Sequence, residues 1–130
     1  MALGYISGLR NAQLDAITTF AGGTAKLTIY SGTRPATGGT ATTALVTLTC
    51  NATFAPAASS GVLTLNAITS ANATSTGTAS WFRLFKTDGT TIVMDGNVGT
   101  SGSDLNFNTV SFVSGASVAI SSFTITAGNA

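Results

Sequence analysis

The chain has 130 residues, enough for one domain whose core needs neither a disulfide nor a metal. Only 7% of the residues are charged, and five basic residues against four aspartates give a net charge of +1. Five scattered basic residues argue against an electrostatic nucleic-acid site, and no window holds the roughly 18 apolar residues of a membrane helix. The start of the chain lacks a secretory signal pattern, so we expect synthesis in the cytoplasm without export.

The low share of charged residues also indicates whether the protein is expected to associate with other subunits. A typical soluble domain has about 25% charged residues, and charge is what keeps protein surfaces apart. A surface of Thr, Ser, Asn, Gly and Ala suits a protein that is packed against neighbours, so we expect a homo-oligomer or a subunit of a larger lattice.

Residues 1–23 are predicted to form an N-terminal arm and one short helix. The arm, Met1 to Ile6, is uncharged and largely apolar. Ser7 is a suitable N-cap, and Gly22 follows the expected end of the helix. Apolar residues at helical spacing predict the face that packs on the rest of the chain: Leu9, Ala12, Ala16, Ile17 and Phe20. Arg10 and Asp15 are expected on the opposite face.

Residues 24–130 are predicted to form a single β domain. Short β-branched runs separated by turn residues predict seven strands, at 25–30, 44–50, 61–68, 77–86, 90–95, 105–112 and 116–126. This pattern favours an all-β, antiparallel sandwich of the jelly-roll or Ig-like kind. In the last two runs the apolar alternation shifts at 108–109 and 121–122, which predicts a bent hairpin.

The segment 77–95 carries the clearest local signal. Asp88-Gly89 between two apolar runs predicts a two-residue hairpin turn, with Arg83 opposite Met94. Both faces of this hairpin are then apolar. One face holds Trp81, Arg83, Phe85, Ile92 and Met94, and the other holds Phe82, Leu84 and Val93. Because a sandwich strand needs one apolar face for its own core, the second face must meet the helix, a loop or another subunit, and we favour another subunit. Arg83 favours the Trp81 face as this outer face.

A second candidate contact lies in the loop "IYSGTRPATGGT". Pro35 favours an extended conformation for Arg34, which holds that side chain out from the end of a strand. Arg34 is then either a solvated turn residue or an arginine that reaches a neighbouring subunit. The candidate protein interface predicted from the sequence comprises Arg34, Pro35, Trp81, Arg83, Phe85, Ile92 and Met94.

The residues that most enzymes need are missing. The chain has no His and no Glu, so it holds no nucleophile–histidine pair and no zinc-ligand cluster. A calcium loop at 95–104 would lack its closing glutamate, and Cys50 is expected to be a buried apolar residue. We therefore predict no enzyme, no catalytic residue, no cofactor and no metal. A carbohydrate-cleaving enzyme that uses Asp95 and Asp104 is the weakest alternative.

Two segments carry a family resemblance. "LDAI" followed by "GGTAKLTIYSGTRPATGG", and "ASWFRLFKTDGTTIVMDGNVGTSGSDL", resemble a family of small virion structural proteins of tailed bacteriophages. The resemblance spans about Leu9 to the end of the chain. It implies a capsid decoration or cement protein, located on the capsid surface, whose partners are the major capsid protein and copies of itself. The alternative is a tail or fibre module that binds host-surface carbohydrate through exposed Trp81 and Tyr30.

Overall fold

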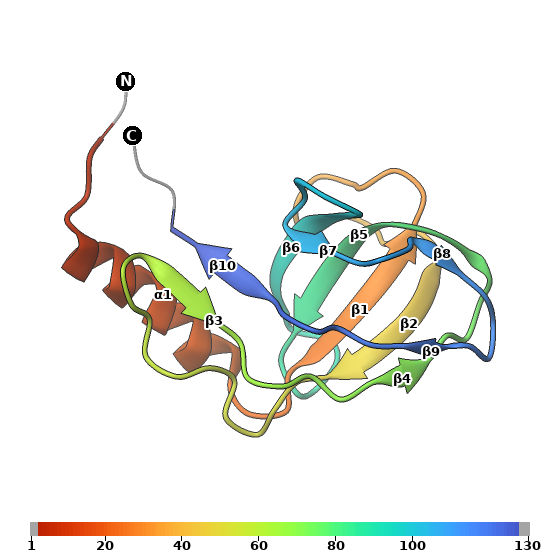
Figure 1. Cartoon of the computed structure of the whole chain (residues 1–130), viewed down its shortest axis with the longest axis horizontal. Helices are drawn as coiled ribbons and strands as arrows, with labels where there is room; N and C mark the ends of the chain where they lie inside the picture. The colour runs from red at the N-terminus through yellow and green to blue at the C-terminus, as the bar shows by residue number, and fades with distance from the viewer. Residues whose placement is uncertain (1–2, 128–130) are drawn as a thin grey trace.

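The computed structural model describes residues 3–127 of the chain. These residues form one helix and ten strands, which are joined by loops (Figure 1). The elements, in chain order, are α1 Ser7–Ala21, β1 Lys26–Ser31, β2 Ala44–Thr49, β3 Val62–Thr64, β4 Ala71–Asn72, β5 Gly77–Phe85, β6 Ile92–Gly99, β7 Leu105–Asn106, β8 Ser111–Phe112, β9 Ser117–Val118 and β10 Thr124–Thr126. Met1 and Ala2 of the expected arm lie outside the described residues.

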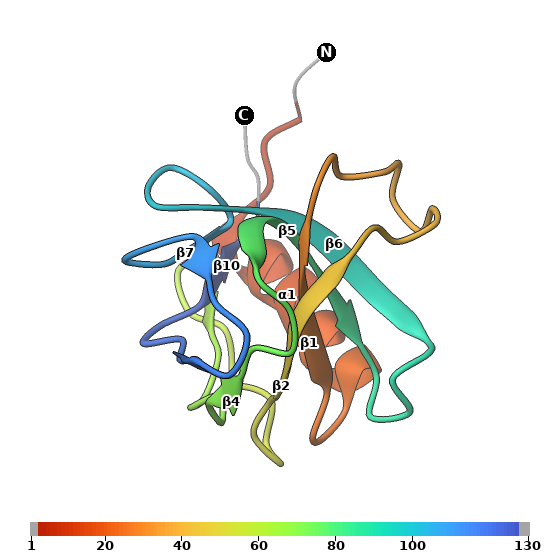
Figure 2. The same cartoon turned by 90° about the vertical axis from the view of Figure 1, so that its right-hand side faces the viewer.

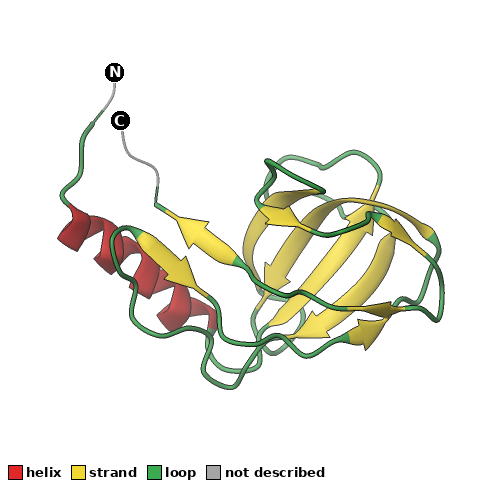
Figure 3. Ribbon diagram, viewed as in Figure 1, coloured by secondary structure: helices red, strands yellow, loops and turns green. Residues whose placement is uncertain are grey.

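The largest sheet has the order β2-β1-β5-β6-β7, with β8 beside the start of β5. This sheet curls into a half-barrel, while β3–β10 and β4–β9 form separate two-stranded pairs (Figures 2 and 3). All pairs are antiparallel except β6–β7, which is parallel. The chain is therefore predominantly β with one N-terminal helix, and its curled sheet is mixed.

The core lies on the inner face of the curled sheet. Leu27 and Ile29 of β1 alternate with residues that point outward, and they pair with Leu84 and Phe82 of β5. The rings of Phe82 and of Phe123, next to β10, pack in a T-shaped arrangement with 5.3 Å between their centroids. The core thus joins the large sheet to the small strand pairs. Cys50 belongs to this core, as expected, and burial raises the pKa of its thiol to about 11.

Helix α1 packs against β3 and β6, but through a different face from the one expected. Leu14 and Ala21 are buried, whereas Leu9 and Phe20 are about half exposed. Polar contacts explain this orientation of the helix, because the two ionisable residues that were expected to face solvent bind backbone groups of neighbouring segments. Asp15 accepts a hydrogen bond from the Ala58 N–H at 2.8 Å, and Arg10 donates to the Ala127 carbonyl at 3.4 Å.

The start of the helix also differs from the expectation. Ile6 is the N-cap, so Ser7 lies within the first turn and makes no side-chain cap bond. The helix ends at Ala21, and Gly22 follows it with a positive φ of 72°. Among the described residues no helix is long and apolar enough to cross a membrane.

The 77–95 hairpin forms with one extra residue. The turn closes through a bond from the Gly89 N–H to the Lys86 carbonyl at 2.9 Å, and Gly89, but not Asp88, has a positive φ. Phe85 pairs with Ile92 as predicted, but Leu84 pairs with Met94 because Val93 forms a bulge. The predicted pairing of Arg83 with Met94 is therefore wrong, and Arg83 lies opposite Asp95.

The last two predicted strands each divide into two, and they do not form a hairpin with each other. Residues 105–112 give β7 and β8, and residues 116–126 give β9 and β10. The breaks contain the positions where the apolar alternation shifts, 108–109 and 121–122. Each short strand pairs with a different partner: β7 with β6, β8 with β5, β9 with β4 and β10 with β3. The bends were predictable, whereas the partners were not.

Candidate functional site

The outer face of the curled sheet is covered by the chain itself. Residues 32–43, between β1 and β2, form a loop that reaches this face (Figure 2). Thr42 accepts a hydrogen bond from Trp81 Nε1 at 2.9 Å, and the Gly38 N–H donates to Asp95 Oδ2 at 3.0 Å. Trp81 is fully buried and Arg83 nearly so. The expectation that a second subunit covers these two residues is therefore wrong.

Tyr30 and Trp81 form a stacked pair beneath this loop. Their ring centroids are 4.2 Å apart with 13° between the planes, and the Arg83 guanidinium lies 5.1 Å from the Trp81 ring. Burial raises the pKa of the Tyr30 hydroxyl, against the opposing effect of the Arg83 charge. The prediction that Trp81 and Tyr30 are exposed platforms for carbohydrate is wrong, because both rings are inside the fold.

A buried ion pair joins β5 to β6. Arg83 Nε and Nη2 donate to the two carboxylate oxygens of Asp95 at 2.6 and 2.9 Å. Burial favours the neutral form of Asp95, but the bonds from Arg83 and Gly38 and the charges of Arg83 and Arg34 outweigh it and lower the pKa of that carboxyl. The same hydrogen bonds, which the Asp95 carboxylate accepts, raise the pKa of Arg83. Both side chains are thus charged, and each neutralises the other.

Arg34 is used within its own chain. Its Nη1 donates to Asn97 Oδ1 at 3.1 Å, and its Nη2 donates to the Asp95 carbonyl at 3.3 Å. Arg34 and the adjacent Pro35 are both half-buried. The arginine therefore anchors the 32–43 loop to β6, a role that was not considered from the sequence.

The other three predicted interface residues, Phe85, Ile92 and Met94, do not lie together: two are at the turn end of the hairpin and one lines a cleft. Phe85 and Ile92 are half-buried at the turn end of the hairpin, where they pair with each other. Met94 lies on the opposite face from Trp81 because of the bulge at Val93, and it lines a cleft. The seven predicted residues therefore do not form one exposed surface.

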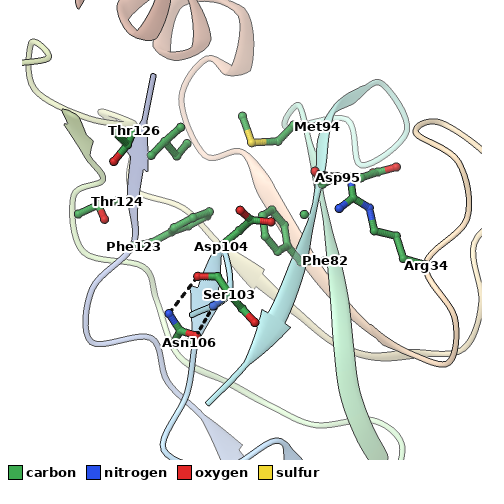
Figure 4. Close-up of a pocket in the computed structure, with 12 residues that line it drawn as sticks. Arg34, Phe82, Met94, Asp95, Ser103, Asp104, Asn106, Phe123, Thr124 and Thr126 are labelled. Carbon is green, nitrogen blue, oxygen red and sulfur yellow. Dashed lines mark hydrogen bonds between the residues drawn. The ribbon is translucent and has the colours of Figure 1, made fainter. Parts of the chain in front are cut away.

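That cleft lies between β6, the start of β7 and β10, and we call it the edge cleft (Figure 4). Its volume is about 420 Å³, and its lining includes Arg34, Phe82, Met94, Asp95, Gly96, Ser103, Asp104, Asn106, Phe123, Thr124, Ile125 and Thr126. Gly96 is required here, because a Cβ atom at this position would overlap the Phe82 ring.

The edge cleft brings together Asp95 and Asp104, the pair that an enzyme would have to use. Asp95 is neutralised by Arg83, and Asp104 Oδ2 accepts a hydrogen bond from the Asn97 N–H at 2.8 Å. The two carboxylates are therefore engaged in structural bonds. The described residues contain no group of three or more His, Cys, Asp or Glu side chains that could hold a metal ion.

A second surface carries exposed apolar side chains at the N-terminal end. Five large apolar residues are exposed among the described residues, and four of them belong to the arm and α1. Leu3 is 57% and Ile6 79% exposed in the arm, and Leu9 is 47% and Phe20 49% exposed in the helix.

Leu9 and Phe20 lie on one side of the helix. They share that side with Ala12 and Ala16, which are also exposed, and we call these four residues the outer helix face. They follow the same helical spacing that predicted a packed face, but all four are exposed. Phe20 has one contact with the hairpin, because Lys86 Nζ lies 4.3 Å from the centroid of its ring. Ile17, the fifth residue of the predicted face, is half-buried and packs against the core, so the prediction is right for Ile17 and wrong for the other four.

Comparison of the chain with protein-family models, with curated proteins and with solved structures finds no match.

Proposed function

We propose that this protein is a non-enzymatic structural component of a bacteriophage particle, and specifically a capsid decoration or cement protein that binds and stabilises the head shell. The observation that carries the proposal is the outer helix face. A helix with apolar residues on two opposite faces uses one for its own core and keeps the other for a partner. The resemblance to phage virion proteins is what directs the proposal to a particle.

The surface chemistry supports an adhesive role. With 7% charged residues, the protein has few charges to desolvate when it binds a flat neighbour. A decoration protein is held at many equivalent positions, so each contact can be modest in strength. In this proposal the partners are the major capsid protein and further copies of the chain, and the location is the capsid surface.

We also propose that the half-barrel is an opened form of the jelly-roll or Ig-like sandwich expected from the sequence. The large sheet would be one layer, and the β3–β10 and β4–β9 pairs would be remnants of the second. Support comes from the contact between Phe82 of the large sheet and Phe123 next to β10.

The test is co-sedimentation with purified, expanded phage heads that lack this protein. Wild-type protein is expected to bind the heads saturably. A Leu9→Ser/Phe20→Ser variant should bind at least about tenfold more weakly, because the contact would lose two apolar anchors. A Val113→Ser variant is the matched control, because Val113 is 58% exposed on a different part of the molecule.

Failure of the wild-type protein to bind heads would overturn the proposal. Equal losses in the double variant and the Val113→Ser control would overturn the assignment to the outer helix face.

A further inference from the structure

Lys86 borders the outer helix face. It follows the last residue of β5, and its Nζ lies 4.3 Å from the centroid of the Phe20 ring. Lys86 is half-buried, whereas Phe20 is 49% exposed. The exposed apolar surface of the helix therefore has a positive charge beside it, at the end where Phe20 lies.

The fold holds Lys86 in this place. Its N–H donates to the Thr91 carbonyl at 2.9 Å, and its carbonyl accepts a bond from the Gly89 N–H at 2.9 Å. The hydroxyl groups of Thr87 and Thr24 are 2.9 Å apart and joined by a hydrogen bond. Because Thr24 lies shortly after α1, this bond ties the hairpin turn to the end of the helix.

The exposed residues of the helix carry no charge of their own. Arg10 and Asp15, the charged residues of α1, bind backbone groups of other segments. The exposed residues that flank the outer helix face are Gly8, Gln13 and Thr19. A partner that covers this face therefore meets apolar and uncharged groups, with the Lys86 ammonium at the rim.

Such a partner must supply an acceptor for Lys86. The ammonium has three donors, and in the part of the chain that the structure describes its contact is with the Phe20 ring rather than with an acceptor. A partner that covers Phe20 displaces water from this charge, which is costly when nothing replaces the water. A carboxylate at the edge of the partner's apolar patch would replace it with a charge-assisted hydrogen bond.

The outer helix face of a second copy does not offer such a carboxylate. In an antiparallel pair of helices, Phe20 of one copy would lie opposite Leu9 of the other, so Lys86 would lie beside the first turn of that helix. This turn has no acidic residue and no side-chain cap, and its free N–H groups carry partial positive charge. In a parallel pair the two Lys86 side chains would meet. Both arrangements bring like charges together.

We propose that the outer helix face binds an apolar patch of the shell protein that has an acidic side chain at its edge, and that Lys86 pairs with this side chain. The inference rests on the proposed attachment to phage heads through this face, and it adds the chemistry of the partner. Apolar burial supplies most of the affinity, whereas the single ion pair sets the orientation and the salt dependence.

Variants at Lys86 test the pair in the head-binding assay. Lys86→Met removes the charge and keeps the apolar stem of the side chain beside Phe20. In about 50 mM NaCl this variant should bind heads about three- to tenfold more weakly than the wild type, because one ion pair is lost. Lys86→Glu should bind more weakly still, because two acidic groups would then face each other.

Salt provides a readout that a merely structural role of Lys86 would not change. Wild-type binding should weaken by about the same factor when NaCl is raised from about 50 mM to about 500 mM, because salt screens the pair. Binding of Lys86→Met should not weaken with salt. Lys26→Met is the matched control, because it removes the same charge from β1, where Lys26 Nζ donates to Thr49 Oγ1 at 3.2 Å. This control should keep the wild-type salt dependence.

Failure of the wild type to bind heads at either salt concentration overturns the proposed function. This inference is instead overturned when the wild type binds heads but Lys86→Met binds equally well, or when the two show the same salt dependence. Analytical ultracentrifugation of the isolated protein gives a further outcome. If the wild type exceeds the 12.9 kDa mass of one chain and Leu9→Ser/Phe20→Ser returns it to that mass, the occupant of the face is a second copy and the proposal is wrong.

Discussion

Asp95 joins three parts of the molecule, namely β6, on which it lies, β5 and the loop of residues 32–43. Its carboxylate binds the Arg83 guanidinium on β5 and the Gly38 N–H in the 32–43 loop, and its carbonyl accepts a bond from Arg34. The side chains of Arg83 and Asp95 are 5% and 0% exposed. A buried pair of this kind contributes little over an apolar substitute, but the loss of one member leaves an uncompensated charge.

Replacement of Asp95 by Asn should therefore destabilise the protein strongly. We expect the free energy of unfolding at pH 7 to fall by about 3–5 kcal/mol, measured by urea denaturation. Asp104→Asn is the matched control, because Asp104 is exposed and accepts a single backbone bond, and its effect should stay below about 1 kcal/mol. An Asp95→Asn protein as stable as the wild type would contradict the structural role of the pair.

The pH dependence of stability follows from the same carboxylate. The pKa of Asp95 is lowered in the folded protein, so its contribution is present above the ordinary value of 3.8 and is lost as the pH falls toward the folded pKa. The unfolding free energy of the wild type should fall between about pH 5 and pH 2, and Asp95→Asn should flatten this fall. Some slope should remain from Asp88, whose pKa is lowered to about 2 by bonds from Thr91 and Thr90.

Single residues differ in how well the sequence predicts their role. Cys50 in the core and Asp88 in the turn follow from residue type and local pattern alone. The Arg83–Asp95 pair does not, because the bulge at Val93 shifts every later residue of β6 by one position relative to β5. A charged residue in the middle of an apolar strand was the available signal, since such a residue needs a partner when the strand is buried.

Helix α1 has apolar residues on two faces, and the structure assigns them opposite environments. Leu14 is buried in the core, whereas Leu9 is half exposed. Leu14→Ala should therefore lower the free energy of unfolding by about 2–5 kcal/mol, and Leu9→Ala should change it by less than about 0.5 kcal/mol. Thermal unfolding followed by circular dichroism measures both. A larger effect of Leu9→Ala than of Leu14→Ala would mean that the helix packs in the orientation expected from the sequence.

The elements that the sequence located well are those whose pattern is local. Strands β1, β2 and β5 start and end within one residue of the predictions, because each is a single run rich in aliphatic, β-branched or aromatic residues between turn residues. The orientation of α1 and the partners of β7 to β10 depend on contacts with distant segments. Arg10 and Asp15 illustrate this limit, since they face inward only because backbone groups at Ala127 and Ala58 need partners.

In the whole molecule, the loop of residues 32–43 covers the outer face of the large sheet, whereas apolar side chains of the N-terminal arm and α1 are exposed. The expected reason for a partner, an open second face on the 77–95 hairpin, does not hold at Trp81 and Arg83, because residues 32–43 cover them. The low charge and the four exposed apolar side chains of the arm and helix now carry the case for assembly.

The copy number of this chain in purified phage particles whose genome encodes it tests the central claim most directly. Quantitative mass spectrometry gives this number relative to the major capsid protein. A protein that coats the shell through its outer helix face should occur in a fixed ratio to the capsid subunits, close to one per subunit or a simple fraction of that. Absence from the particles, or a handful of copies per particle, would contradict the account.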